Sequence, residues 1–587
     1  TVCGQYFFAR NFSLFSFDYR DRWIRGLSGG KPGRKISMIL DLSFIGLQFD
    51  LVVLGIWLSE MFRMPLDLLL CSSMFILACG SLLLGYPVAF TLPGVSVIFA
   101  GLGYAMGIFD FSIVGGVPQR IYGTMTNVVM MAVPLFVFMG VMLERSRIAE
   151  ELLESMGQLM GRVKGGLGIS VTIVGALLAA STGIVGATVV IMGLMALPTM
   201  LNKGYSPAIA TGGIAAAGTL GQIIPPSIVL VLLGDQLSSA WQASQLAQGN
   251  FSPSPLSVGD LFAGALIPGL GLVLMYVLYQ VTIAILFPSS CPPTTDSEET
   301  LDLKPVLAAF LPPIVLVIAV LGSILGGVAT PTEAAAIGAV GAMLMAGYKL
   351  DKTNPKPVLV AGSSIIVLLL LGGLFDLRMG RQEIPALDYL AFAISLPVLA
   401  AMIWGTGISL LRIYREGVLQ EVVQMTARTS SMIFIIMVGA ALFTLIFLGF
   451  SGDYYITQFL TNLPGGRLGA FILVMLVMFI LGFFLDFIQI VFVVVPIVAP
   501  VLFLMDINPI WLGVMMAMNL QTSFLTPPFG YALFYLRGVA PEQQVKTTDI
   551  YKGVMPFIAI QLIALIILYN FEGLVTWLPS IVFGSGL

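Results

Sequence analysis

GTLGQIIPPSIVLVLLG (Gly218 to Gly234) and LQTSFLTPPFGYALFYL (Leu520 to Leu536) are the two stretches that decide how this chain folds. Each carries a Pro-Pro pair inside an otherwise apolar run, and the two pairs lie 302 residues apart. Proline lacks a backbone N–H and interrupts the helical hydrogen-bond ladder. We therefore predict two broken helices, over residues 207–234 and 510–537.

The offset between the two stretches extends to their surroundings, since it also carries Pro198 onto Pro500. Further upstream the motif around Pro87 resembles that around Pro331 at an offset of 244, which is 58 residues shorter. An insertion over 350–410, with two extra apolar spans, accounts for the difference. The chain is thus predicted to be an internal duplication.

Composition places the chain in the membrane. Of 587 residues, 58% are hydrophobic and 10% are charged, whereas soluble domains carry about 25% charged residues. The chain has no histidine, which excludes His-dependent hydrolases and His-ligated metal sites. Its four cysteines show no metal-ligand spacing, and a net charge of −3 argues against nucleic acid as a partner.

Many apolar runs of this chain are near the roughly 20 residues that a helix needs to span a bilayer. The expected spans are 38–60, 65–84, 87–108, 127–145, 207–234, 261–287, 305–325, 331–349, 357–375, 386–411, 429–450, 510–537 and 552–570. They divide the chain into an extension (1–62), a first repeat (63–287), a linker (288–304), the start of a second repeat (305–349), the insertion (350–410), the rest of that repeat (411–570) and a tail (571–587).

Two longer stretches, 166–202 and 466–504, are each interrupted at the centre, by Ser181 to Gly183 and by Leu485 to Gln489. We interpret both as re-entrant helical hairpins, whose irregular tips are tolerated at membrane depth where they face protein or a cavity. A pair of ordinary crossing helices is the alternative. Residues 146–161 are predicted to form an amphipathic helix, at the interface or as an arm supporting the hairpin, and 236–260 an exposed loop or short surface helix.

Five crossings plus one hairpin in each repeat would invert the second repeat relative to the first, because five is odd. Seven Lys and Arg residues precede the first span, so the N-terminus is expected to be cytoplasmic. Broken helices in matching positions of inverted repeats are typical of secondary transporters that bind solute at the bilayer midplane. The predicted fold is therefore an all-α polytopic membrane protein with inverted repeats, two re-entrant hairpins and two broken helices.

Broken helices expose backbone N–H and C=O groups that attract anions and cations. The expected substrate and ion ligands are Ser181, Thr182, Gly183, Thr188, Thr219, Gly221, Gln222, Pro225, Pro226 and Ser227 in the first half, and Asp486, Gln489, Asn519, Thr522, Ser523, Thr526, Pro527, Pro528 and Gly530 in the second. Sodium is expected at Ser181, Gly183, Thr219, Gly221, Thr522 and Thr526. Asp486 is the strongest single candidate, because a carboxylate is costly in lipid.

The hydroxyl residues and the proline pairs also have an alternative interpretation, in which they serve only the packing of the helices. Membrane Ser and Thr residues often only bond back to their own helix, and the proline pairs can simply kink packing helices. We interpret the Met and Phe stripes as lipid-facing or packing surface.

The motifs GTLGQIIPPS, GVATPTEAAA and LTPPFG, in this order, make residues 66–570 resemble the large membrane subunit of tripartite ATP-independent periplasmic (TRAP) transporters, the DctM-like family. The resemblance implies an elevator-type, sodium-driven importer of organic acids (carboxylates) in the bacterial inner membrane. It also implies two partners: a small four-helix membrane subunit, expected as a separate chain, and a periplasmic binding protein. No cofactor other than sodium as coupling ion is expected.

Three alternatives remain. A single-component ion-coupled anion transporter would work without a binding protein, and a channel would show no saturable uptake. An intramembrane enzyme is disfavoured, because the chain offers no histidine for a catalytic pair. The substrate stays open: no Lys or Arg lies at the expected site, so half-helix N-termini and hydroxyls are expected to recognise the anion.

Overall fold

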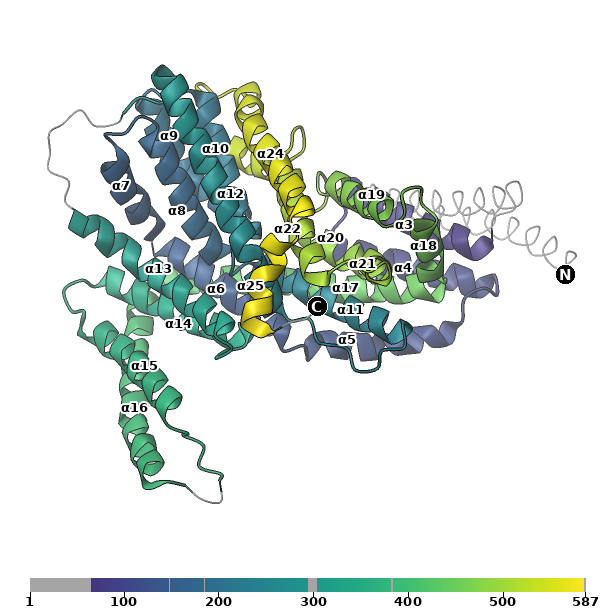
Figure 1. Ribbon diagram of the computed structural model, residues 1–587, viewed down its shortest axis with the longest axis horizontal. Coiled ribbons are helices and arrows are strands. Elements are labelled where there is room, and N and C mark those ends of the chain that lie inside the picture. Colours follow the sequence, from purple (N-terminus) through teal and green to yellow (C-terminus); the bar gives the residue numbers. More distant parts are fainter. Residues whose placement is uncertain (1–64, 147, 184, 294–302, 382–383, 585–587) are drawn as a thin grey trace, which may run out of the picture.

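The computed structural model describes residues 65–146, 148–183, 185–293, 303–381 and 384–584 (Figure 1). The expected span 38–60 lies outside them. In the described part, every regular element is a helix and no β-strand is present. Nine of these helices are long and apolar enough to cross a membrane, or up to eleven if each of two bent pairs counts as one span. The prediction of an all-α polytopic membrane protein is confirmed for this part of the chain.

The helices of the first half follow the expected spans closely. In chain order they are α3 (Leu66–Leu83), α4 (Val88–Ala105), η1 (Phe111–Gly116), α5 (Val117–Met125), η2 (Val129–Met131), α6 (Ala132–Arg145), α7 (Ile148–Met160), α8 (Gly166–Thr182), α9 (Val185–Asn202), α10 (Pro207–Thr219), η3 (Leu220–Gln222), α11 (Ile228–Ala247), α12 (Val258–Leu286) and η4 (Pro288–Ser290).

The second half repeats much of this order. It comprises α13 (Leu303–Leu325), α14 (Pro331–Leu350), α15 (Lys356–Leu374), α16 (Ala386–Arg415), α17 (Val418–Gly449), α18 (Gly452–Thr461), α19 (Gly466–Leu481), α20 (Phe487–Val493), α21 (Val495–Leu504), α22 (Pro509–Leu525), α23 (Tyr531–Val539), α24 (Thr547–Asn570) and α25 (Gly573–Phe583).

Each stretch expected to form a hairpin contains two helical arms. In the first, α8 ends at Thr182, and Gly183 takes a left-handed conformation with φ 61°, as a helix end that reverses the chain often requires. In the second, the break covers residues 482–486, between α19 and α20. The expected position 485–489 was too late by about one turn, since helix resumes at Phe487. The second arm also bends by 54° between α20 and α21.

Both expected helix breaks are present. Residues 223–227 separate η3 from α11, and residues 526–530 separate α22 from α23. The peptide bonds Pro225-Pro226 and Pro527-Pro528 are both cis.

The region expected as a loop or short surface helix, 236–260, begins within a longer helix, since α11 continues to Ala247. Just before this region, Asp235 accepts a hydrogen bond of 2.7 Å from Asn127 Nδ2. The tail contains the helix α25, which packs on α12 and α22.

Contacts between the halves are reciprocal. After its break, the first half's α11 packs on α20 and α21 of the second hairpin, and the second half's α23 packs on α9 of the first hairpin. In the same way α10 packs on α24 while α22 packs on α12, and α6 packs on α14 while α17 packs on α4. The two halves therefore interlock through their hairpins, their broken helices and the helices α4, α6, α14 and α17.

The short helices that precede the hairpins are tied to the opposite half as well. On α7, Glu151 forms ion pairs with Lys349 (2.7 Å) and Lys352 (3.1 Å) at the end of α14. On α18, the Tyr455 hydroxyl donates to Asp67 Oδ2 of α3 at 2.6 Å. The amphipathic helix expected over 146–161 is thus present as α7, and its apolar side packs on α8 and α13.

The expected insertion forms α15 and α16, a helical pair that projects from the rest of the molecule (Figure 1). In the most apolar stretch of each of these two helices, only 17% of the residues are buried inside the molecule. The pair is anchored at its base, where Arg412 forms a 3.0 Å ion pair with Asp351 and donates to the Asn354 carbonyl at 2.9 Å.

Candidate substrate and ion site

The tip of the first hairpin lies directly against the first helix break. A Cβ atom at Gly183 would lie 3.0 Å from Ile228 Cγ1, at the start of α11. A Cβ at Gly221, in η3, would lie 3.1 Å from the carbonyl oxygen of Ala179 in α8. Both glycines therefore permit a close approach of backbones, and the hairpin tip and the break form one unit.

The hydroxyls of the first break donate to backbone carbonyls. Thr219 Oγ1 donates to Ala216 at 2.8 Å, and Ser227 Oγ donates across the break to Gln222 at 2.9 Å. The hydrogen atom of such a hydroxyl is already used in a hydrogen bond, whereas its oxygen lone pairs remain available to a cation. Pro225 and Pro226 are buried around them, and Thr188 is buried in α9. Ser181 and Thr182 end α8; their side chains are outside the described part.

Two glutamines near the breaks are buried without a hydrogen-bond partner among the described residues. Gln222, in η3, and Gln521, in α22, are both 0% exposed, and neither amide atom of either side chain is paired. Gln521 lies near the Tyr276 hydroxyl. A buried amide left unpaired costs about 1–3 kcal/mol, so these two positions favour a polar occupant such as water or an ion.

The second break has the same kind of hydroxyls in a more open setting. Thr522 Oγ1 donates to Met518 at 2.8 Å, and Thr526 Oγ1 donates to Thr522 at 2.7 Å. Thr526 and Pro527 are half-buried and Pro528 is exposed, whereas Gly530 is buried and begins α23.

Two of the expected ligands hold the second hairpin instead of facing an open space. Asn519 Nδ2 donates to the Met475 carbonyl at 2.8 Å, and Ser523 Oγ donates to the Phe479 carbonyl at 2.7 Å. Both carbonyls belong to α19, the first arm of the hairpin. These side chains therefore fasten α22 to that arm.

Asp486 begins α20 at the tip of the second hairpin. Its Oδ1 accepts a hydrogen bond of 2.8 Å from the N–H of Phe487, and the residue is half-buried. No Lys or Arg forms an ion pair with it among the described residues. Gln489 is half-buried one turn later and donates its N–H to the Asp486 carbonyl at 3.1 Å.

The two broken helices pack against each other, since α22 contacts both α10 and η3. Gly221 and Gln222 of η3 therefore lie beside the helix that carries Asn519, Thr522 and Ser523. In the described residues, no group of three or more His, Cys, Asp and Glu residues is arranged to hold a metal. Any cation bound here would rely on hydroxyls, carbonyls and single carboxylates.

Two buried hydrogen bonds of α12 were not expected from the sequence, one to the second half and one within the first half. Gln561 Nε2 of α24 donates to the Tyr276 hydroxyl of α12 at 2.8 Å, and Gln280 Nε2 of α12 donates to Thr172 Oγ1 of α8 at 2.6 Å. A signal was present, because a single Gln inside a long apolar helix rarely lacks a partner in lipid.

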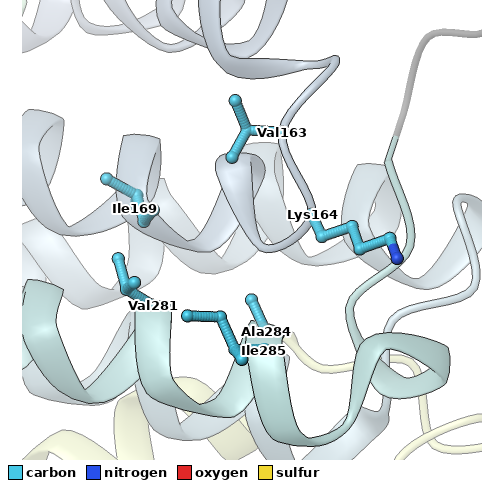
Figure 2. Close-up of a pocket in the computed structure, with 6 residues that line it drawn as sticks. All are labelled: Val163, Lys164, Ile169, Val281, Ala284 and Ile285. Carbon is cyan, nitrogen blue, oxygen red and sulfur yellow. The ribbon is translucent and has the colours of Figure 1, made fainter.

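Two cavities were found outside this hydrogen-bonded core. One, of about 480 Å³, lies where α8 begins and is lined by Val163, Lys164, Ile169, Val281, Ala284 and Ile285 (Figure 2). It includes none of the expected ligands. The other, of about 400 Å³, lies beside the second break and is lined by Phe483, Phe484, Phe529, Tyr531, Phe534 and Tyr535. Four of the six are Phe residues, a residue type that the sequence pattern favours as packing or lipid-facing surface.

Many apolar helices, two of them interrupted where buried polar groups gather, define a multi-pass membrane permease. The sequence matches the family described as "Tripartite ATP-independent periplasmic transporter, DctM component" over residues 75–574, and the chain belongs to this family.

Named relatives agree with this assignment. A C4-dicarboxylate TRAP transporter large permease protein of Vibrio cholerae is 28% identical over 87% of this chain and 98% of its own length. A protein of the same name from Pseudomonas aeruginosa is 26% identical over 82% of the chain and 92% of its own length. An isethionate TRAP transporter permease protein of Oleidesulfovibrio alaskensis is 25% identical over 85% of the chain and 65% of its own length.

Proposed function

We propose that this chain is the large membrane subunit of a sodium-coupled importer of organic acids. The observation that supports the proposal best is the contact between the two broken helices. Each of them also packs against the hairpin of the first half and the hairpin of the second half. A solute bound there contacts elements from both repeats, as alternating access requires. The substrates in the names of the relatives, C4-dicarboxylates and isethionate, are small organic acids.

The reciprocal packing supports the inverted-repeat hypothesis. When two repeats are related by a two-fold axis, as inverted repeats are, each contact between the repeats is accompanied by the contact between the corresponding elements. Here α11 corresponds to α23 and α21 corresponds to α9, and the contact of α11 with α21 is matched by the contact of α23 with α9. We infer an elevator movement, in which the hairpins and broken helices shift together against α3, α4, α6, α13, α14 and α17. The hairpin tip Gly183 is too closely packed on Ile228 for the two to move apart independently.

Sodium is the proposed coupling ion. Ser181, Gly183, Thr219 and Gly221 would supply ligands at the first break, and Thr522, Thr526 and Asp486 at the second. Hydroxyls that already donate to carbonyls offer only lone pairs, which suits a hard cation and not an anion. Asp486 has no basic partner among the described residues, so a bound cation would balance its charge.

The proposed partners are a small membrane subunit, as a separate chain, and a periplasmic binding protein that delivers the acid. The chain would lie in a bacterial inner membrane with its N-terminus in the cytoplasm. Membership of a tripartite family supports the two partners, although the isethionate relative carries the compound name DctMQ. The orientation is supported by the Lys and Arg residues that precede the first expected span.

The test is uptake into proteoliposomes that contain the full chain and its small subunit, with binding protein added outside. Uptake is expected to be saturable and to need both an inward sodium gradient and the binding protein. Equal uptake by the chain alone would favour the single-component carrier, and non-saturable flux would favour a channel.

A matched pair of variants tests the sodium ligands. Thr526→Ala is expected to raise the sodium concentration for half-maximal uptake. Thr282→Ala is the control, because Thr282 lies exposed on α12 and makes an equivalent hydrogen bond of 2.7 Å to the Leu278 carbonyl. Equal sodium dependence in both variants would remove Thr526 from the site.

A further inference from the structure

We propose that the acid carried by this permease is a monoanion with an apolar, ring-sized body, and that this body binds in the open cavity beside the second break. The inference rests on the proposed function and names its substrate class. It differs from the C4-dicarboxylates in the names of two relatives.

The cavity has the size and the lining for such a body. Its volume of about 400 Å³ is bounded by six aromatic side chains and by no charged one. A dry apolar cavity of about 150 Å³ already accommodates benzene. The rings are held at fixed mutual angles: Phe484 lies 6.3 Å from Phe483 at 80° and 5.1 Å from Phe529 at 40°. Aromatic substrates gain from such offset and edge-to-face contacts.

The cavity is built from the same segments as the candidate site. Phe483 and Phe484 belong to the break of the second hairpin, Phe529 follows Pro528, and Tyr531 begins α23. The Tyr531 hydroxyl donates to the Phe484 carbonyl at 3.2 Å and so links the hairpin break to the helix break.

The first hairpin also reaches this cavity. A Cβ atom at Gly186, in α9, would lie 2.7 Å from the Tyr535 ring. Elements of both halves therefore meet around the cavity, as expected for a substrate site and not for a surface that only contacts lipid.

Charge decides between a monoanion and a dianion. No Lys or Arg lines the cavity, and the faces of aromatic rings carry negative potential. A second carboxylate inside the cavity would lose its hydration without gaining a basic partner. One carboxylate at the rim is favoured instead, because α23 begins there with no side chain capping its N-terminus.

The test measures direct binding to the purified membrane complex without the binding protein, so that the selectivity of that partner does not contribute. Radiolabelled benzoate and succinate are the two probes, in sodium-containing buffer. Benzoate is expected to bind at least about tenfold more tightly than succinate, a difference of about 1.4 kcal/mol. Phe534→Ala is expected to weaken benzoate binding about tenfold and to leave succinate binding unchanged.

Phe571→Ala is the matched control, since Phe571 is 63% exposed and Phe534 is 61% exposed, but only Phe534 lines the cavity. Gly186→Ala is a second cavity variant, which displaces the Tyr535 ring without removing any side chain, and it should also weaken benzoate binding. Monodispersity by size exclusion confirms that each variant is folded.

Succinate binding as tight as benzoate binding would overturn the inference. So would equal benzoate affinity in Phe534→Ala, Gly186→Ala and Phe571→Ala, which would leave the cavity to lipid acyl chains. Failure of the proposed function is a separate result: the assembled transporter would then show no sodium-dependent uptake of any acid.

Discussion

The two helix breaks share a sequence pattern and differ in their surroundings. At the first, Pro225 and Pro226 are buried, and the hairpin tip Gly183 is packed against α11. At the second, Pro527 is half-buried, Pro528 is exposed, and an aromatic cavity of about 400 Å³ lies alongside. One break is thus closed by packing, and the other opens to a cavity.

The difference indicates that the two breaks have different roles. The first break offers hydroxyls and glycines but no carboxylate, and close packing fixes its geometry. The second adds Asp486 and aromatic rings, and it has room for a solute. We therefore expect changes at the first break to affect stability most, and changes at the second to affect transport most.

The largest effect is expected from Gly183→Ala. A left-handed conformation costs a residue with a Cβ about 1–2 kcal/mol, and the new methyl group would also press on Ile228, which adds about 1–3 kcal/mol. The midpoint of thermal unfolding should fall clearly. Gly107→Ala is the control, because Gly107 has a similar φ of 70° with nothing within 4 Å of its Cβ position. An equal fall in both variants would show that packing at the first break is unimportant.

Next comes Asp486→Asn, which retains a side chain able to cap α20 and removes only the charge. Sodium-driven uptake should fall at least about tenfold, or about 1.4 kcal/mol, with little change in thermal stability. Asp506→Asn provides the comparison, since Asp506 is exposed between α21 and α22 and its φ of 58° suits asparagine. Wild-type uptake by Asp486→Asn would contradict the role of the second break in transport.

A smaller loss of stability is expected when the hydrogen bond between α12 and α24 is removed. Tyr276→Phe removes the partner of Gln561 Nε2 in a fully buried position, at a cost of about 1–3 kcal/mol. Adding Gln561→Leu should restore most of the stability, because replacing both partners by apolar groups is nearly neutral. A double variant that is less stable than Tyr276→Phe would argue against this hydrogen bond as the cause.

The smallest effect concerns the tie between α7 and the end of α14. Burial raises the pKa of Glu151, but hydrogen bonds and charge from Lys349 and Lys352 outweigh it and lower the pKa overall. A lowered pKa stabilises the fold at pH above the unfolded value of about 4.3, and that contribution is lost as the pH falls through the folded value.

Glu151→Gln should therefore reduce stability at pH 7 by less than about 1 kcal/mol, because the pair is partly exposed. The difference between wild type and variant should shrink as the pH is lowered below about 4. Thermal melts at both pH values measure it. A difference that grows on acidification would rule out the ion pairs as its origin.

Much of the fold could be predicted, because its strongest signals are local. Proline pairs interrupt apolar runs wherever they occur, and the Ser-Thr-Gly break of the first hairpin ends in Gly183, the residue that reverses the chain. The break of the second hairpin was placed too late, because Phe483, Phe484 and Leu485 are apolar residues that continue the helical pattern until Asp486. The helix α25 was missed because Pro579 interrupts a short apolar stretch.

The candidate site could be predicted by residue type but not by direction. The sequence does not reveal that Asn519 and Ser523 donate to carbonyls of α19, whereas Thr526 lies at an open break. Nor does it distinguish an aromatic side chain that lines a cavity from one that faces lipid. Both distinctions depend on contacts between residues distant along the chain.

The projecting pair α15 and α16 has a mechanical consequence. A helical pair that projects from the molecule adds viscous drag to the part that carries it, and Arg412 joins its base to the end of α14. In the proposed elevator movement, α14 is therefore expected to stay nearly stationary while the hairpins and broken helices shift.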